Sequence, residues 1–188
     1  DAGTVLLHLG MSGSLRLVPQ DTPAGPHDHV DLALDSGKVL RLHDPRRFGS
    51  LHWFEAAGPT HPLLARLGPE PLEPGFDGAY LHRVSRGRRS SIKALIMNAQ
   101  VVAGIGNIYA TEALFLAGIR PRRAAGRITR IEAERLAAAL RQVLEAALEQ
   151  GGTTLRDFLR EDGRPGYFAQ SLRVYGWADR PCPVCQSP

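Results

Sequence analysis

The sequence predicts an α+β protein built from more than one domain. Three observations lead to this class. The first third of the chain reads as short strands, the middle reads as helices, and the end carries Cys182-Pro-Val-Cys185, half of a zinc-ribbon motif. The hydrophobic fraction of 43% and the charged fraction of 22% are ordinary for a globular protein, and no apolar run reaches membrane-spanning length.

The N-terminal part is expected to form antiparallel β structure. The segment Asp35-Ser-Gly37 predicts a hairpin turn between two strands. In the strand before it, Val30, Leu32 and Leu34 alternate with other residues, as a half-buried strand requires. We therefore predict part of an antiparallel sandwich or barrel in residues 1–56, with strands at 4–9, 14–18, 29–34, 38–43 and 50–55.

Residues 57–75 are rich in proline and glycine, which predicts an irregular arm or a linker, the latter assigned to residues 57–76. After them the hydrophobic periodicity becomes that of helices. Helices are expected at 90–99, 107–117 and 129–150. In the last of these, Thr129 and Glu132 form a capping box and Gly151-Gly152 ends the helix. Short strands are expected before Cys182, and residues 77–174 are assigned to one domain. The apolar stripe of the long helix consists of Leu136, Leu140, Val143, Leu144, Ala147 and Leu148.

Two turns carry residues that suit contact with nucleic acid. In the turn at 101–106, Gly104 and Gly106 allow positive φ, and the N–H groups at the head of the next helix can hold a phosphate. The alternative is an ordinary helical hairpin, which the turn alone favours. The tip Asp44–Gly49 carries Phe48 beside Arg46 and Arg47, which suits a wedge in a base stack; the alternative is an exposed turn with a hydrophobic anchor.

The net charge of +4 rests almost entirely on arginine, because only Lys38 and Lys93 are lysines. Arginine binds phosphates and base edges bidentately, although a GC-rich genome would explain the same composition. The basic cluster of residues 83–93 is either a solvated face or a phosphate-binding face. The sequence holds no P-loop, GxSxG or HExxH motif, so its residues alone indicate a non-catalytic DNA-binding module. The cluster consists of Arg83, Arg86, Arg88, Arg89 and Lys93.

Cys182 and Cys185 are interpreted as half of a zinc site rather than as a redox pair. Pro183-Val184 between them resembles a ribbon knuckle, and the pair does not open a helix. A tetrahedral structural zinc needs four protein ligands, and no histidine lies beyond His82. Residues 175–188 are therefore expected to be the first half of a zinc finger.

Seven segments, taken in order, resemble the formamidopyrimidine-DNA glycosylase family of bacterial base-excision repair, over nearly the whole chain. The resemblance implies an N-terminal β-sandwich, a helix–two-turn–helix domain and a C-terminal finger with one structural Zn²⁺. It implies a DNA glycosylase/AP lyase that removes oxidised purines, namely 8-oxoguanine and formamidopyrimidines, from duplex DNA. The endonuclease VIII branch, which prefers oxidised pyrimidines, is the alternative. The segments are HLGMSGSLR, HDHVDL, DPRRFG, LGPEPL, VVAGIGNIYATEALFLAGI, QGGTTLRDF and DGRPGYFAQSLRVYG.

The resemblance also implies roles for single residues. Met11 fills the space of the extruded lesion, Arg46 faces the estranged cytosine and Phe48 wedges beside it. Residues 154–167 cover the flipped base. The resemblance further implies phosphate contacts by His27, Arg47, Arg89 and Asn107, a buried supporting Lys93, Glu112 near the catalytic pocket, Tyr175 on the active-site side, and Cys182 and Cys185 as the first two zinc ligands.

The printed sequence departs from the family at its ends. The family's nucleophile is an N-terminal proline amine followed by glutamate, which attacks C1′ of the damaged nucleotide to form a Schiff base before β,δ-elimination. That pair, a further lysine and the second CxxC are absent from these 188 residues. We therefore expect no glycosylase or lyase activity and weak or no zinc binding from this chain alone. We expect a cytoplasmic, nucleoid-associated monomer without membrane contact, whose partner is double-stranded DNA with oxidised bases or abasic sites.

Overall fold

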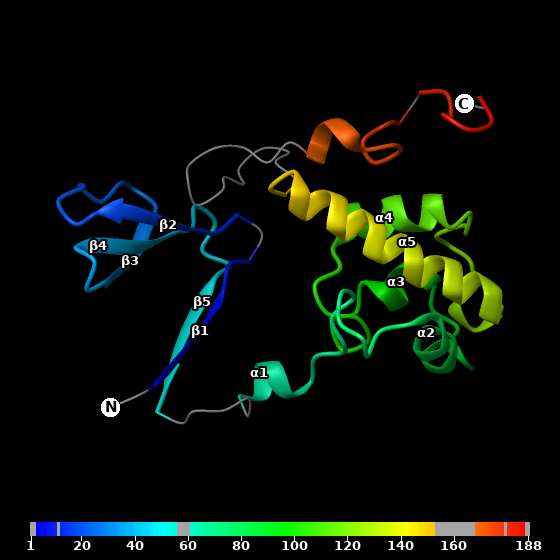
Figure 1. Cartoon of the computed structure of the whole chain (residues 1–188), viewed down its shortest axis with the longest axis horizontal. Coiled ribbons are helices and arrows are strands. Elements are labelled where there is room, and N and C mark those ends of the chain that lie inside the picture. Colours follow the sequence, from blue (N-terminus) through cyan, green and yellow to red (C-terminus); the bar gives the residue numbers. More distant parts are fainter. Residues whose placement is uncertain (1–2, 11, 56–60, 153–167, 179, 187–188) are drawn as a thin grey trace. The chain divides into compact units, whose positions relative to one another are not determined.

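The computed structural model describes residues 3–10, 12–55, 61–152, 168–178 and 180–186. Figure 1 shows strands in the N-terminal part of the chain and helices in the part that follows. The chain divides into two compact units. The first comprises residues 1–59 with 149–170, and the second comprises residues 60–148 with 171–188. Each unit is described by itself.

The first unit contains the strands that the sequence predicted. They form two antiparallel sheets, one of order β1–β5 and one of order β2–β4–β3. The hairpin between β3 and β4 is confirmed, since the Leu34 N–H donates to the Lys38 carbonyl at 2.9 Å and Gly37 has φ +73°. The strands are β1 (Thr4–His8), β2 (Ser14–Pro19), β3 (Asp28–Ala33), β4 (Lys38–His43) and β5 (Ser50–Phe54).

The predicted alternation of buried and exposed residues in β3 is observed, with Val30 and Leu32 half-buried between exposed neighbours. Leu34 was expected on the same face, but it lies beyond the strand and is exposed. The adjacent β4 buries Arg41, which donates from Nε and Nη2 to the Asp31 carboxylate at 2.8 Å and from Nη2 to the Thr22 carbonyl at 2.9 Å. The hydrogen bond from Arg41 lowers the pKa of Asp31. This arginine therefore ties a loop to the sheet and is structural.

The second unit is helical. Helices α3, α4 and α5 confirm the three that the sequence predicted. Helix α3 is shorter than expected, because it begins after its N-cap, Ser91, and ends at Ile96, before the turn in which the Val101 N–H donates to the Asn98 carbonyl. Helix α2 was missed, although Asp77 caps it by accepting from the Tyr80 N–H at 2.6 Å. The helices are α1 (Pro62–Ala65), α2 (Gly78–Ser85), α3 (Ile92–Ile96), α4 (Asn107–Leu116) and α5 (Arg130–Glu149), with the 3₁₀ turn η1 (Ala125–Arg127). A further 3₁₀ turn, η2 (Phe168–Ser171), has its first three residues in the first unit and Ser171 in the second.

The capping box of α5 is confirmed. The Glu132 N–H donates to Thr129 Oγ1 at 3.2 Å, and the Thr129 N–H donates to Glu132 Oε2 at 2.8 Å. Leu148 was wrongly placed in the apolar stripe, since 67% of its surface is exposed. Five of the buried residues, at 133, 136, 140, 143 and 147, recur at intervals of three or four, and Leu148 lies one position beyond the last of them. The buried residues of α5 are Ala133, Leu136, Ala137, Ala139, Leu140, Val143 and Ala147.

The segment expected to be a linker contains a short helix, α1, and a packed stretch at 68–76. Phe76 and Pro71 in this stretch are fully buried. A Cβ on Gly68 would lie 2.5 Å from the Val101 carbonyl group, so only glycine allows this approach. The guanidinium of Arg141 on α5 donates from Nε to the Pro71 carbonyl at 2.9 Å and also reaches the Phe76 carbonyl. The proline and glycine content of this stretch therefore serves close packing.

Among the residues that the structure describes, no helix has the length and apolar composition needed to cross a bilayer.

Removing the guanidinium of Arg141 should destabilise the helical unit. Arg141→Met keeps the aliphatic stem but leaves backbone carbonyls of residues 71–76 without their donor, which costs about 1–3 kcal/mol. Urea unfolding followed by helix circular dichroism measures the loss, because the α-helices of the described chain begin in this unit. Arg135→Met, on the exposed face of the same helix, is the matched control. Equal losses for the two variants would contradict the assignment.

Candidate functional site

The tip between β4 and β5 presents an aromatic ring and two arginines. Phe48 is 59% exposed, so it does not anchor the turn in a core. The Arg46 guanidinium carbon lies 5.0 Å from the centre of the Phe48 ring, a cation–π arrangement. Arg47 between them has φ +56°, in the left-handed region that residues other than glycine rarely adopt. The tip therefore exposes the groups that the sequence singled out.

A buried carboxylate holds this tip in place through hydrogen bonds. Asp44, at the end of β4, is 2% exposed. Its Oδ2 accepts from the Gly49 N–H at 2.7 Å, and its Oδ1 accepts from the Ser12 hydroxyl at 3.3 Å. The Gly49 N–H is the main reason that the pKa of Asp44 lies below its ordinary value; burial opposes this effect, and the Ser12 hydroxyl and the N–H groups of Arg46 and Arg47 add to it.

The turn at 9–13 packs directly against this tip. Gly10 has φ +62°, and a Cβ there would lie 2.8 Å from the Phe48 carbonyl carbon. The Gly13 N–H donates to the Leu9 carbonyl at 2.9 Å and closes the turn. The two turns, which look independent in the sequence, thus share one surface of the first unit. Met11, the residue assigned to fill the lesion's space, lies outside the described residues.

His27 belongs to the same part of the molecule. Its carbonyl accepts from the Asp44 N–H at 2.9 Å, and its ring meets the His43 ring edge-on at 5.9 Å between centres. His29 Nε2 lies 2.9 Å from the Asp44 carbonyl oxygen. The structure therefore brings His27 to the base of the tip that carries Arg46, Arg47 and Phe48.

The glycine turn of the second unit leads into α4. Gly104 has φ +75°, as predicted. Gly106 was expected to be similar, but it has φ −95° and is the N-cap of α4. Glycine has no side chain to cap the first N–H groups of the helix, and a Cβ at Gly106 would meet nothing within 4 Å. The head of α4 is therefore open at Gly106, which suits a phosphate.

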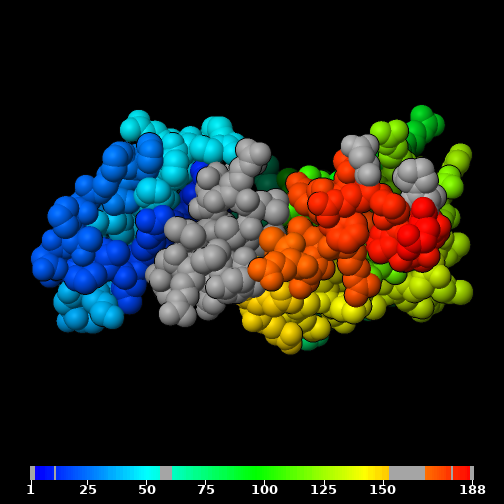
Figure 2. All heavy atoms as spheres, turned by 90° about the horizontal axis from the view of Figure 1, so that it is seen from above, coloured from blue at the N-terminus to red at the C-terminus, as the bar shows by residue number. Residues whose placement is uncertain are grey.

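Asn107, Glu112 and Tyr175 form one assembly. Asn107 Nδ2 donates to the Tyr175 hydroxyl at 3.3 Å. Glu112, 2% exposed on α4, accepts the consecutive N–H groups of residues 173, 174 and 175 at 2.9, 3.0 and 2.8 Å. Glu112 thus anchors the segment that carries Tyr175. Figure 2 shows this C-terminal segment, in orange and red, on the outside of its unit.

The basic cluster at 83–93 divides into different environments. Arg86 donates to the carbonyls of His82 at 3.2 Å and Ile128 at 2.5 Å, so it is a structural clamp. The Arg83 guanidinium carbon lies 5.3 Å from the centre of the Tyr80 ring. Arg89 is exposed, while Lys93, expected to be buried, is only half-buried.

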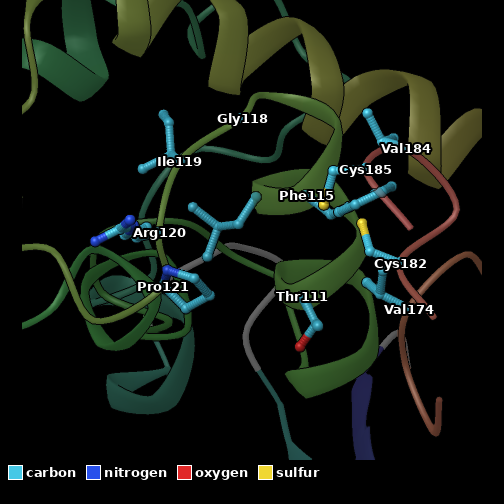
Figure 3. A pocket seen from close by; sticks show the side chains of 11 residues that line it. Thr111, Phe115, Gly118, Ile119, Arg120, Pro121, Val174, Cys182, Val184 and Cys185 are labelled. Carbon is cyan, nitrogen blue, oxygen red and sulfur yellow. The ribbon is translucent and has the colours of Figure 1, made fainter. Parts of the chain in front are cut away.

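Cys182 and Cys185 lie on one turn, closed by the Gln186 N–H donating to the Cys182 carbonyl at 2.9 Å. Both thiols line an apolar groove of about 420 Å³ beside Phe115 of α4 (Figure 3). Across the described residues, no group of three or more histidine, cysteine, aspartate or glutamate side chains could hold a metal. The two thiols therefore do not complete a tetrahedral zinc site by themselves.

The prediction of short strands before Cys182 was wrong for residues 168–178, which form η2 and turns.

Comparison with known proteins agrees with this arrangement. A family model described as the formamidopyrimidine-DNA glycosylase N-terminal domain matches residues 1–51, and one described as the H2TH domain matches residues 67–159. The formamidopyrimidine-DNA glycosylases of Thioalkalivibrio sulfidiphilus and Nitrosococcus oceani are 63% and 60% identical to this chain over 188 and 186 residues. The matches cover 100% and 99% of this chain and 69% of each relative.

This chain belongs to the formamidopyrimidine-DNA glycosylase family. MutM (Fpg) from Thermus thermophilus superposes with a TM-score of 0.88 at 42% identity, over 99% of this chain and 69% of that one. Lactococcus lactis Fpg, in a complex with DNA containing an abasic site, superposes with a TM-score of 0.86 at 28% identity, over 100% of this chain and 69% of that one. The predicted order of an N-terminal β structure followed by a helix–two-turn–helix domain is thereby confirmed.

Sequence reasoning missed two features of this glycosylase-family chain. Asp44 was seen only as the first residue of a turn, although aspartate is the residue that typically binds nearby N–H groups in turns. Glu112 was assigned to the catalytic pocket by resemblance, and nothing in the local sequence indicated that it accepts N–H groups more than sixty positions away. The available signal was that Glu112 is the one charged residue of α4.

Replacing Glu112 should loosen the Tyr175 segment in a graded way. Glu112→Ala removes the acceptor for three N–H groups, whereas Glu112→Gln keeps one oxygen. Amide hydrogen exchange at residues 173–175, followed by NMR, should accelerate about tenfold or more in the alanine variant and less in the glutamine variant. Glu145→Ala, on the exposed face of α5, should leave these rates unchanged. Unaltered exchange in Glu112→Ala would show that the segment is held by other contacts.

Proposed function

We propose that this chain recognises damaged DNA as part of a base-excision repair glycosylase/AP lyase for oxidised purines in duplex DNA. The observation that carries the proposal is the exposed Arg46–Phe48 pair on a tip held by buried contacts. A mutant of Lactococcus lactis Fpg has been solved with DNA containing Fapy-dG, and Lactococcus lactis Fpg has been solved with DNA containing an abasic site, which supports this substrate class. Because the relatives are bacterial, we place this action in the cytoplasm, and we propose that the protein acts as a monomer.

The tip suits a wedge that replaces an extruded nucleotide. An apolar ring inserted between base steps compensates for lost stacking, and an adjacent arginine can donate to the unpaired base. Stacking of Arg46 on Phe48 places the guanidinium beside the ring before DNA arrives. Phe48 then acts as the wedge and Arg46 as the reader of the opposite base. Met11 is proposed to fill the lesion's space.

Phosphate contacts are assigned to His27, Arg47, Arg89 and Asn107. The first two accompany the tip, and Asn107 stands at the open head of α4, where the helix dipole favours an anion. The Asn107–Tyr175 hydrogen bond links this phosphate site to the segment that Glu112 anchors. Lys93 on α3 is assigned a supporting role. The amine that attacks C1′ in the family is not among these 188 residues, so binding is the measurement for this chain.

Arg46→Ala should weaken discrimination by the base opposite the lesion, because a lost arginine–base contact is worth about 1–3 kcal/mol. Arg89→Ala and Asn107→Ala should weaken binding uniformly, because phosphates carry no sequence information. Arg89→Ala should also lower the salt slope of log K by about one unit, whereas Asn107→Ala should leave it unchanged. The measurement is the affinity of the 188-residue chain for a duplex with an abasic-site analogue opposite C, A, G or T, against salt.

Arg135→Ala, which removes the same charge from the exposed face of α5, is the control for Arg89→Ala. If Arg46→Ala keeps the preference for cytosine while Asn107→Ala changes it, the assigned roles are wrong. A chain that binds damaged and intact duplex equally would contradict the proposed function.

The cysteine pair is proposed as half of a structural zinc site in the first half of a finger at residues 175–188, next to a DNA-binding domain at 77–174. Two thiolates leave the tetrahedral shell of Zn²⁺ incomplete, so the 188-residue chain should not hold one tight zinc per monomer. Cobalt titration should give a weak thiolate charge-transfer band that Cys182→Ser and Cys185→Ser each abolish. Stoichiometric, chelator-resistant metal in the purified chain would contradict this.

A further inference from the structure

We propose that Asp44 is a positioning residue that fixes the Arg46–Phe48 tip to the Gly10–Ser12 turn and so sets discrimination by the base opposite the lesion. The inference rests on the proposed function of the tip. Asp44 is itself 2% exposed, so it acts through the residues that it holds and not by touching DNA.

The two carboxylate oxygens of Asp44 bind two different segments. Oδ1 accepts from the Ser12 hydroxyl at 3.3 Å, and Oδ2 accepts from the Gly49 N–H at 2.7 Å. Ser12 lies in the turn before β2, and Gly49 is the last residue of the tip before β5. One side chain therefore joins the two turns across 32 positions of sequence.

Glycine at positions 10 and 49 allows the backbone to pack closely here, because a side chain at either position would clash with its neighbours. A Cβ at Gly10 would lie 2.8 Å from the Phe48 carbonyl carbon and 2.9 Å from its oxygen. A Cβ at Gly49 would lie 2.9 Å from Asp44 Oδ2 and 2.9 Å from the His8 carbonyl oxygen. The backbone of the wedge residue thus lies against Gly10 of the other turn, with no room for a side chain between them.

The tip needs such support because its central residue is strained. Arg47, between the proposed reader and the wedge, has φ +56°. Conformations of this kind persist only where the surroundings determine them. The Arg47 N–H donates to the Asp44 carbonyl at 3.3 Å, and the N–H groups of Arg46 and Arg47 also face the carboxylate. Asp44 therefore holds both sides of the strained residue.

The buried carboxylate has a cost that only these bonds offset. An ionised carboxylate removed from water is unfavourable unless it is paired or hydrogen-bonded. The donors described for Asp44 are a hydroxyl and backbone N–H groups, and all of them belong to the two turns. Asparagine would keep the Gly49 bond through its oxygen and could donate to Ser12 Oγ, while alanine would lose both. Asp44→Asn should therefore disturb the tip less than Asp44→Ala does.

The test compares Asp44→Ala, Asp44→Asn and Ser12→Ala in the 188-residue chain. The probe is a duplex with an abasic-site analogue opposite C or A, at fixed salt. Asp44→Ala should reduce the preference for C by about three- to tenfold, approaching the effect of Arg46→Ala, while affinity for undamaged duplex changes less than about twofold. Asp44→Asn should retain part of the preference. Asp35→Asn, an exposed carboxylate in the β3–β4 turn, should behave as wild type.

Two further measurements separate positioning from general loss of structure. Combined with Arg46→Ala, Asp44→Asn should cause no additional loss of preference, because it acts through Arg46. Hydrogen exchange of the amides at 47 and 49, without DNA, should accelerate in Asp44→Ala while the β1–β5 amides keep their rates. If exchange and preference both stay at wild-type values, or the two variants add independently, the proposal is overturned. A wild-type chain without any opposite-base preference overturns the proposed function instead, whatever the exchange rates show.

Discussion

Both candidate surfaces depend on a buried carboxylate that accepts backbone N–H groups. Asp44 binds the Gly49 N–H under the tip of the first unit, and Glu112 binds three consecutive N–H groups in the second. A carboxylate that is only 2% exposed is tolerated only where several hydrogen-bond donors replace the water molecules that would otherwise solvate it. Because those donors belong to segments that carry exposed functional groups, satisfying the charge also fixes the segments. Phe48 is exposed and Tyr175 is only half-buried, so full burial of its own side chain fixes the position of neither residue.

Arginine serves two purposes in this chain, and its number does not distinguish them. Arg41, Arg86 and Arg141 point their guanidinium groups at carbonyls or carboxylates of the fold. Arg46, Arg47 and Arg89 are exposed on segments assigned to DNA. A guanidinium has five donors in a planar fork, so it can gather several carbonyls at the end of a loop as well as it can bind a phosphate. The positive net charge is therefore only partly a sign of a nucleic-acid partner.

Local patterns predicted the elements whose signals lie within a few residues. The capping box of Thr129 and Glu132, the turn at Gly37 and the helix that starts at Asn107 appear where they were expected. The failures share a cause. Helix α2 and the packed stretch at 68–76 depend on partners far along the chain, such as Arg141 and Val101, which composition cannot indicate. Proline and glycine looked like a linker there because loops and tightly packed turns use the same residues.

The family, the order of strands and helices, and the exposed groups of the tip could all be predicted without a structure, because motifs and hydrophobic periodicity are local properties. Which polar residues work together could not be predicted, because their partners come together only on folding. Ser12 and Gly49 both donate to the Asp44 carboxylate, and Glu112 holds the Tyr175 segment close to Asn107. These contacts join residues as many as 68 positions apart. The hydrogen-bond donors of a buried carboxylate are those that folding brings within reach, and no local sequence pattern identifies them.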